Sequence, residues 1–115
     1  MFFGEFFSKT DKDGRSYIPE KLRKKKLKDI IFLTKGPDGC LLICQKTKDS
    51  IERKMNKQGM ILIPKSLRVY AGLEEKIVFV GCGKRIEIWS VKNWVREKKK
   101  MDKRWFRSFF WGNYY

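Results

Sequence analysis

Residues 56–68 read NKQGMILIPKSLR, and residues 11–23 read DKDGRSYIPEKLR. The second stretch repeats the first after a shift of 45 residues. Similarity at a fixed spacing indicates a repeated structural unit, so the sequence predicts two copies of one unit. The identical pairs within these stretches are Lys12 and Lys57, Gly14 and Gly59, Ile18 and Ile63, Pro19 and Pro64, Leu22 and Leu67, and Arg23 and Arg68.

Each copy predicts the same order of elements. A polar turn carries Gly14 or Gly59, since glycine tolerates a positive φ. A short strand follows at 16–18 or 61–63. Pro19 or Pro64 then ends the strand and opens a short helix, at 20–26 or 65–70. Two strands joined by a turn complete the unit, at 30–34 and 40–44 in copy one and at 76–80 and 85–89 in copy two.

The two copies are expected to share one core. A unit of about 40 residues is too small to bury its apolar face alone, whereas two copies bury those faces against each other. We therefore expect a mainly β fold with short helices, in which two interlocked halves form a pseudo-twofold β-barrel. Residues 1–44 would form the first repeat, 45–55 a short linker, 56–94 the second repeat and 95–115 a basic helix with an aromatic tail. The large aromatic residues expected in the core or at the seam between the two halves, rather than stacked on a ligand, are Phe32, Phe79, Trp89 and Trp94.

The composition favours an anionic partner. The chain of 115 residues carries a formal net charge of +15, and 42% of it is hydrophobic. A globular protein with so large a charge is expected to bind nucleic acid first and an acidic membrane surface second. A merely lysine-rich composition is the alternative explanation.

The chemistry of the residues does not indicate an enzyme. The chain has no histidine, and its three cysteines do not make a zinc site, so we expect no metal and no cofactor. Cys40, Cys44 and Cys82 are predicted to be small core residues of a reducing cytoplasm. The N-terminal MFFGEFF lacks a basic region and is interrupted by Glu5, so it is not expected to be a signal peptide.

Several phrases together resemble the MraZ family, which is built from two SpoVT-AbrB-type repeats. They are MFFGEF at 1–6, the D-x-x-G-R and IP-x-x-LR motifs, GPDGCLLI at 36–43 and AGLEEKIVFVGCGKRIEIW at 71–89. The resemblance covers about residues 1–94. It implies a swapped-hairpin β-barrel and a cytoplasmic, nucleoid-associated protein. It also implies ring-like homo-oligomers that bind short direct repeats in double-stranded DNA upstream of division and cell-wall genes.

The family's DNA-binding signature is D-x-x-x-R in each repeat. In this chain the signature is complete only in copy one, where it consists of Asp11 and Arg15. The corresponding residues of copy two are Asn56 and Met60. An arginine bridges a phosphate or holds a guanine edge with two hydrogen bonds, whereas methionine does neither. We therefore expect copy one to be the main DNA reader, with Asp11 paired to Arg15. The alternative is that this pair only fixes a surface turn.

Lysines near the signature are candidate phosphate contacts. Lys12 and Lys57 occupy matching places beside the two turns. The run LRKKKLK at 22–28 has no acidic residue, which makes Lys24 and Lys25 further candidates. The alternative for this run is a solvated helix face. Gly14, Pro19, Gly59 and Pro64 are predicted to be structural.

Two segments depart from the family pattern. Family members carry a helical stretch between the repeats that helps subunits pack, and only 45–55 stands there in this chain. The tail WFRSFFWGNYY, 105–115, is rich in aromatic residues. It fits packing or self-association, base stacking, or contact with a membrane surface. The leading hypothesis is thus a sequence-specific DNA-binding regulator. The alternatives are a non-specific nucleic-acid or membrane-surface binder and a regulator that has lost DNA recognition.

Overall fold

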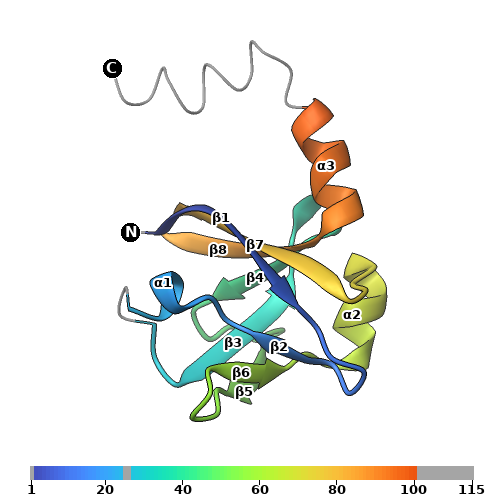
Figure 1. Cartoon of the computed structure of the whole chain (residues 1–115). Coiled ribbons are helices and arrows are strands. Elements are labelled where there is room, and N and C mark those ends of the chain that lie inside the picture. The colour runs from blue at the N-terminus through green and yellow to red at the C-terminus, as the bar shows by residue number, and fades with distance from the viewer. Residues whose placement is uncertain (1, 25–26, 101–115) are drawn as a thin grey trace, which may run out of the picture.

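The computed structural model describes residues 2–24 and 27–100, which form a curved β-structure with short helices at its periphery (Figure 1). The chain runs through β1 (Phe2–Lys9), β2 (Arg15–Tyr17), α1 (Glu20–Arg23), β3 (Ile30–Lys35), the 3-10 turn η1 (Pro37–Gly39), β4 (Leu41–Cys44), β5 (Ile51–Lys54), β6 (Met60–Leu62), α2 (Lys65–Ala71), β7 (Lys76–Gly83), β8 (Arg85–Ser90) and α3 (Val91–Lys100). The predicted mainly β class with short helices and a C-terminal helix is confirmed.

The sheet is made by exchange of strands between the repeats. Six antiparallel strands follow the order β1-β7-β8-β4-β3-β5, and β2 pairs with β6 in a separate two-stranded ribbon. The first strand of copy one, β1, pairs with β7 of copy two, and the first strand of copy two, β5, pairs with β3 of copy one. Neither repeat can therefore complete its sheet without the other, which is the interlocked arrangement expected.

A pseudo-twofold axis relates the two copies. In the ribbon, Ser16 pairs with Ile61, and the flanking pairs, Arg15 with Leu62 and Tyr17 with Met60, exchange under the 45-residue shift. In the large sheet, Leu42 pairs with Glu87 at the equivalent central position between β4 and β8. The axis thus passes through the middle of both pairings.

Two strands were not predicted from the sequence. β1 begins within the N-terminal MFFGEFF stretch, for which the sequence predicts no strand. β5 lies inside the segment that we had interpreted as a linker, so the connection between the repeats is residues 45–50. β5 reads IERK, with a single apolar residue, and its side chains alternate between half-buried and exposed. A strand that buries so little has no apolar pattern from which it could be predicted.

The main core is filled from both copies. Buried pairs at matching positions include Ile18 with Ile63 and Leu22 with Leu67. Phe79 lies in this core, whereas Phe32 is only half-buried. The register explains the difference, because Leu33 of β3 is the buried inward residue and Phe32 points to the opposite face.

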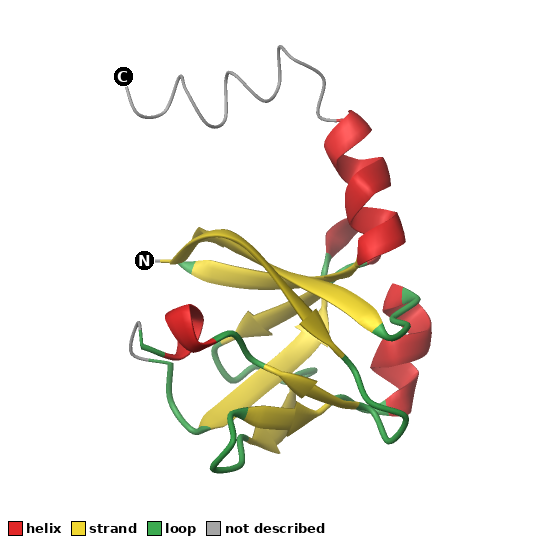
Figure 2. Ribbon diagram, viewed as in Figure 1, coloured by secondary structure: helices red, strands yellow, loops and turns green. Residues whose placement is uncertain are grey.

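A second, smaller core lies under the C-terminal helix. Trp89 and Trp94 are buried with Cys40, Val78 and Val80 on the outer face of β7 and β8. The rings of Trp89 and Trp94 lie 5.5 Å apart between centroids. α3 begins at Val91, earlier than predicted, and packs on this cluster through Trp94, its buried residue, while the rest of the helix extends from the end of β8 (Figure 2). The aromatic run at 105–115 lies outside the described residues.

The predicted helices lie after Pro19 and Pro64. α2 ends at Gly72, whose φ of 61° is the left-handed conformation expected of a glycine cap. α1 is described only to Arg23, with Lys24 as its cap. Among residues 2–24 and 27–100, no helix is long and apolar enough to cross a membrane.

Candidate nucleic-acid interface

The two signature turns have the same construction. Oδ1 of Asp11 accepts the backbone N–H groups of Asp13 and Arg15, each at 2.9 Å. Oδ1 of Asn56 accepts those of Gln58 at 3.0 Å and Met60 at 2.9 Å. Both turns need a side-chain oxygen at this position, not a charge. The replacement of Asp11 by Asn56 in copy two therefore keeps the turn.

The side chain of Arg15 does not pair with Asp11 as predicted. Its Nη1 lies 3.3 Å from Oδ2 of Asp13, and both side chains are about half exposed or more. The hydrogen bond from the Arg15 N–H is the main reason why the pKa of Asp11 is lowered. An exposed ion pair contributes only about 0–1 kcal/mol, so Arg15 can readily exchange Asp13 for another anion.

The repeated Leu-Arg arginines are structural. Nε of Arg68 donates to the carbonyl of Ile63 at 3.0 Å, and its guanidinium lies over Gly14 of the other repeat. Arg23 does the same in the other direction, with its Nε 2.8 Å from the Ile18 carbonyl and its guanidinium over Gly59. Each repeat thus supports the turn of its partner.

The positive backbone angles support the predicted role of the two glycines. Gly14 has a φ of 90° and Gly59 a φ of 83°, which favour glycine. The carbonyls of Pro19 and Pro64 accept the first backbone hydrogen bonds of α1 and α2. The carbonyls of Gly59 and Gly14 in turn accept the N–H groups of Ile18 and Ile63, each at 2.9 Å, which ties the two copies together.

The ribbon has one buried and one exposed face. Ser16 and Ile61 point inward and are buried, whereas Arg15, Tyr17 and Leu62 are exposed and Met60 is half-buried on the outward face. Sequence reasoning chose Arg15 and Met60 and missed Tyr17 and Leu62. Burial alternates along both strands in the structure, but MIL is apolar at all three positions, so the sequence alone gave no signal for Leu62.

Hydrogen bonds to neighbouring strands fix the ribbon on the body of the protein. Oγ of Ser8 in β1 donates to the Tyr17 carbonyl at 2.7 Å. Nε of Arg53 in β5 donates to the Leu62 carbonyl at 3.0 Å. After the 45-residue shift, Arg53 corresponds to Ser8 and Leu62 to Tyr17, so the two hydrogen bonds are equivalent. Arg53 was not among the predicted site residues, and its contact places a further cation beside the exposed face.

The predicted lysines have different settings. Lys12 and Lys57 are exposed in the two turns, which lie at opposite ends of the ribbon because β2 and β6 are antiparallel (Figure 1). Lys24 is exposed at the end of α1, with its Nζ 3.2 Å from Oε1 of Glu20. Lys25 lies outside the described residues.

A groove of about 730 Å³ lies beside the second turn. It is lined by Arg23, Leu27, Asp29, Lys54, Met55, Asn56, Lys57 and Gly59.

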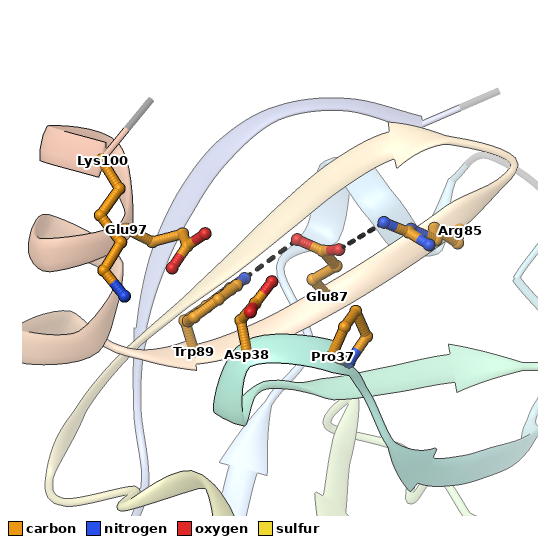
Figure 3. A pocket seen from close by; sticks show the side chains of 7 residues that line it. All are labelled: Pro37, Asp38, Arg85, Glu87, Trp89, Glu97 and Lys100. Atoms are coloured by element: carbon orange, nitrogen blue, oxygen red, sulfur yellow. Dashed lines mark hydrogen bonds and ion pairs between the residues drawn. The ribbon is translucent and has the colours of Figure 1, made fainter. Parts of the chain in front are cut away.

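A second hollow, of about 280 Å³, lies between α3 and the β-sheet (Figure 3). Glu87 occupies its floor, where Oε1 accepts the indole N–H of Trp89 at 3.0 Å and Oε2 lies 2.9 Å from Nη2 of Arg85. Both carboxylate oxygens therefore already have partners. Among the described residues, no group of histidine, cysteine and acidic side chains is arranged to hold a metal ion.

The three cysteines differ in burial, and burial raises the pKa of each thiol. Cys40 is buried, and Cys44 and Cys82 are half-buried; all three are free thiols. Burial is the largest cause that raises the pKa of Cys40 and of Cys82, each to about 12, and the charge of Glu87 is the next cause. The prediction of a core residue is therefore confirmed for Cys40, whereas Cys44 and Cys82 are only half-buried.

Two interlocked repeats, strand exchange and an outward-facing two-stranded ribbon define a swapped-hairpin protein of the SpoVT-AbrB type. Residues 49–106 match a family model described as "MraZ protein, putative antitoxin-like". The chain belongs to the MraZ family.

Curated relatives support the assignment over most of the chain. "Transcriptional regulator MraZ" of Heliobacterium modesticaldum is 33% identical, covering 87% of this chain and 88% of the relative. Proteins of the same name from Caldicellulosiruptor saccharolyticus and Ligilactobacillus salivarius are 35% and 36% identical, over 84% and 82% of this chain and 86% and 84% of their own lengths. The alignment to the first relative spans 127 positions, more than the 115 residues here, so that relative has residues that this chain lacks.

A solved structure also matches with a low score. The solution structure of PHS018 from Pyrococcus horikoshii aligns with a TM-score of 0.40 and 20% identity, over 73% of this chain and 84% of that chain. A likeness at this score adds nothing to the assignment.

Proposed function

We propose that this protein is a sequence-specific, double-stranded DNA-binding transcriptional regulator of the MraZ type, which reads short direct repeats mainly through Arg15. The observation that carries the proposal is the place of Arg15. It lies on the outward face of a two-stranded ribbon that hydrogen bonds hold on the body of the protein, and within the described part of the chain its side chain pairs with the exposed Asp13. The curated relatives are named as transcriptional regulators.

The ribbon has suitable dimensions for DNA. Paired strands lie about 4.8 Å apart, and the major groove is about 12 Å wide, so a two-stranded ribbon with its side chains fits inside it. An arginine on such a ribbon can donate two hydrogen bonds to O6 and N7 of guanine. Asp11 would act indirectly, by fixing the backbone from which Arg15 projects.

Cations around the ribbon would supply the affinity that does not depend on sequence. Lys12 and Lys57 stand at its two ends, Arg53 lies beside it, and Lys24 is exposed on α1 near the second turn. In this proposal these side chains contact phosphates while the ribbon contacts bases. A protein with this function would act on the chromosome in the cytoplasm. Homo-oligomers would place several ribbons on consecutive repeats.

The test is fluorescence anisotropy on duplexes with short direct repeats and on scrambled duplexes, at several salt concentrations. We expect tighter binding to the repeats by the parent protein. Arg15→Ala should lose about 1–3 kcal/mol of that preference, as expected for one bidentate base contact.

Arg96→Ala is the matched control. It removes the same charge from the exposed side of α3, away from the ribbon (Figure 1). It should lower the affinity for both duplexes slightly and leave the preference unchanged. Equal, strongly salt-dependent binding of every variant to every duplex would contradict the proposal and would favour a non-specific binder.

A further inference from the structure

The outward face of the ribbon is chemically uneven. Arg15 is directly opposite Leu62, and Tyr17 is directly opposite Met60. Under the pseudo-twofold, Met60 takes the place of Arg15 and Leu62 the place of Tyr17. One position of the face is therefore cationic, whereas the other three are occupied by mainly apolar side chains.

This apolar surface is exposed on a strongly basic protein. Tyr17 is 46% exposed and Leu62 is 41% exposed. Lys12, Lys57 and Arg53 surround the face. An apolar patch with a cationic rim is complementary to the DNA major groove. Anionic phosphates border the groove and would face the cations, and the apolar methyl groups of thymine lie within it and would face the patch.

We propose that Met60, together with Leu62 and Tyr17, contacts the C5-methyl group of thymine in the major groove. The ribbon then reads guanine with Arg15 and thymine with the Met60 side. The inference rests on the proposed function, since it needs the ribbon to enter the groove. Under this proposal the loss of arginine in copy two changes which base is read and does not abolish reading by that copy.

The geometry of the ribbon predicts the spacing of the two bases. Outward residues on one strand are two apart, which is about 7 Å. Arg15 and Met60 are diagonal neighbours across the pair, at a similar separation of roughly 7–8 Å. Successive base pairs are about 3.4 Å apart along the duplex. We therefore expect the thymine about two base pairs from the guanine that Arg15 contacts.

The test begins with selection of bound duplexes from a random library by the parent protein. Each thymine of the selected motif is then replaced singly by deoxyuridine, which removes the methyl group and leaves the hydrogen-bonding edge unchanged. Affinity should fall about fourfold at one or two thymines near the guanine, which corresponds to the loss of one buried methyl group. Thymines elsewhere in the duplex should show no change.

Protein variants assign the effect to Met60. Met60→Ala should lose most of the sensitivity to deoxyuridine, and Met60→Arg should select guanine in place of that thymine. Val69→Ala is the matched control, because Val69 is an apolar side chain exposed on α2 outside the ribbon. It should keep the sensitivity of the parent.

The outcomes separate this inference from the proposed function. A selected motif that tolerates deoxyuridine at every thymine would overturn the inference and leave recognition through Arg15 intact. The same conclusion follows if Met60→Ala is as sensitive as the parent. Failure to select any motif would overturn the proposed function and the inference together. The deoxyuridine arm uses the unaltered protein, so a folding defect cannot explain its result.

Discussion

The guanidinium of Arg68 in copy two lies over Gly14 in copy one, and a Cβ atom at position 14 would come within 2.7 Å of its Cζ. Arg23 and Gly59 repeat the relationship, with a separation of 2.5 Å. In the repeated sequence, the glycine of one copy therefore contacts the arginine of the Leu-Arg motif in the other copy. This contact explains why both are kept in copy two, where the cationic signature residue is not.

Gly14→Ala should destabilise the protein by about 1–3 kcal/mol. A β-carbon strains the backbone at a φ of 90° and also collides with the Arg68 guanidinium. Arg68→Ala removes the collision but not the strain, so the loss in the double variant should be smaller than the sum of the two single losses by at least about 0.5 kcal/mol. Urea unfolding of the four proteins measures this coupling. Strict additivity would show that the two residues do not interact.

Asp11→Asn should keep the first turn at neutral pH, since Asn56 builds the same turn in copy two. Asp11→Ala, which removes the acceptor of two backbone N–H groups, should lower the Tm at pH 7. Thermal unfolding followed by circular dichroism compares the variants. If Asp11→Asn were as unstable as Asp11→Ala, the negative charge and not the oxygen acceptor would be the important feature.

The same residue predicts a dependence on pH. The pKa of Asp11 is lowered in the folded protein, chiefly because its carboxylate accepts the Arg15 N–H. Its contribution to stability is therefore complete above the ordinary aspartate range, near pH 4, and is lost as the pH falls through the lower folded-state value. Asp11→Asn cannot titrate, so it should lose less Tm than the parent between pH 5 and about pH 2. Identical acid profiles would contradict this assignment.

Trp94→Ala should destabilise the protein by about 3–5 kcal/mol, which is typical of a large buried aromatic side chain. Trp94 is 5% exposed, packs against Trp89 and donates its indole N–H to Glu5 of β1. Glu5→Gln keeps an acceptor and loses only the exposed ion pair with Lys98, so it should cost less than about 1 kcal/mol. Chemical unfolding followed by circular dichroism compares the free energies of unfolding of the two variants. A larger loss for Glu5→Gln than for Trp94→Ala would show that the charge of Glu5, not aromatic packing, holds α3 on the sheet.

The thiols should be slow to alkylate. A pKa of about 12 for Cys40 and Cys82 leaves roughly one part in a thousand as thiolate at pH 8.5–9. We expect iodoacetamide to modify these residues in the folded protein about a thousandfold more slowly than in urea, as measured by mass spectrometry of peptides. Glu87→Gln should accelerate the reaction at Cys82, because it removes the negative charge that adds to the effect of burial. Rapid modification of the folded parent would show that these thiols are accessible and ionised.

The repeat predicted the fold well because its invariant residues have structural tasks. Gly14, Pro19 and Leu22 specify a turn, a helix start and a core contact, and their partners in copy two do the same. The sequence predicted that the copies interlock, but it did not show which strands pair between them. β5 was missed because Glu52, Arg53 and Lys54 resemble a solvated connection, and only the edge of β3 makes them a strand.

The candidate site was predicted in position but not in its contacts. The ion pair expected between Asp11 and Arg15 does not form, since the Asp11 carboxylate is used by backbone N–H groups within its own turn. Tyr17 and Leu62 were missed because each lies opposite a residue of the other copy, and that register is set by the fold. Their exposure is evident only when the ribbon is formed.

The most direct test of the proposed DNA recognition combines a change in the protein with a change in the base. Each guanine of a selected duplex is replaced by 7-deazaguanine, which lacks the N7 acceptor, and the parent and Arg15→Ala are compared by anisotropy. The parent should lose about 3- to 10-fold in affinity at one guanine per repeat, and Arg15→Ala should lose nothing more at that position. Equal losses by both proteins, or no loss by either, would contradict recognition of guanine by Arg15.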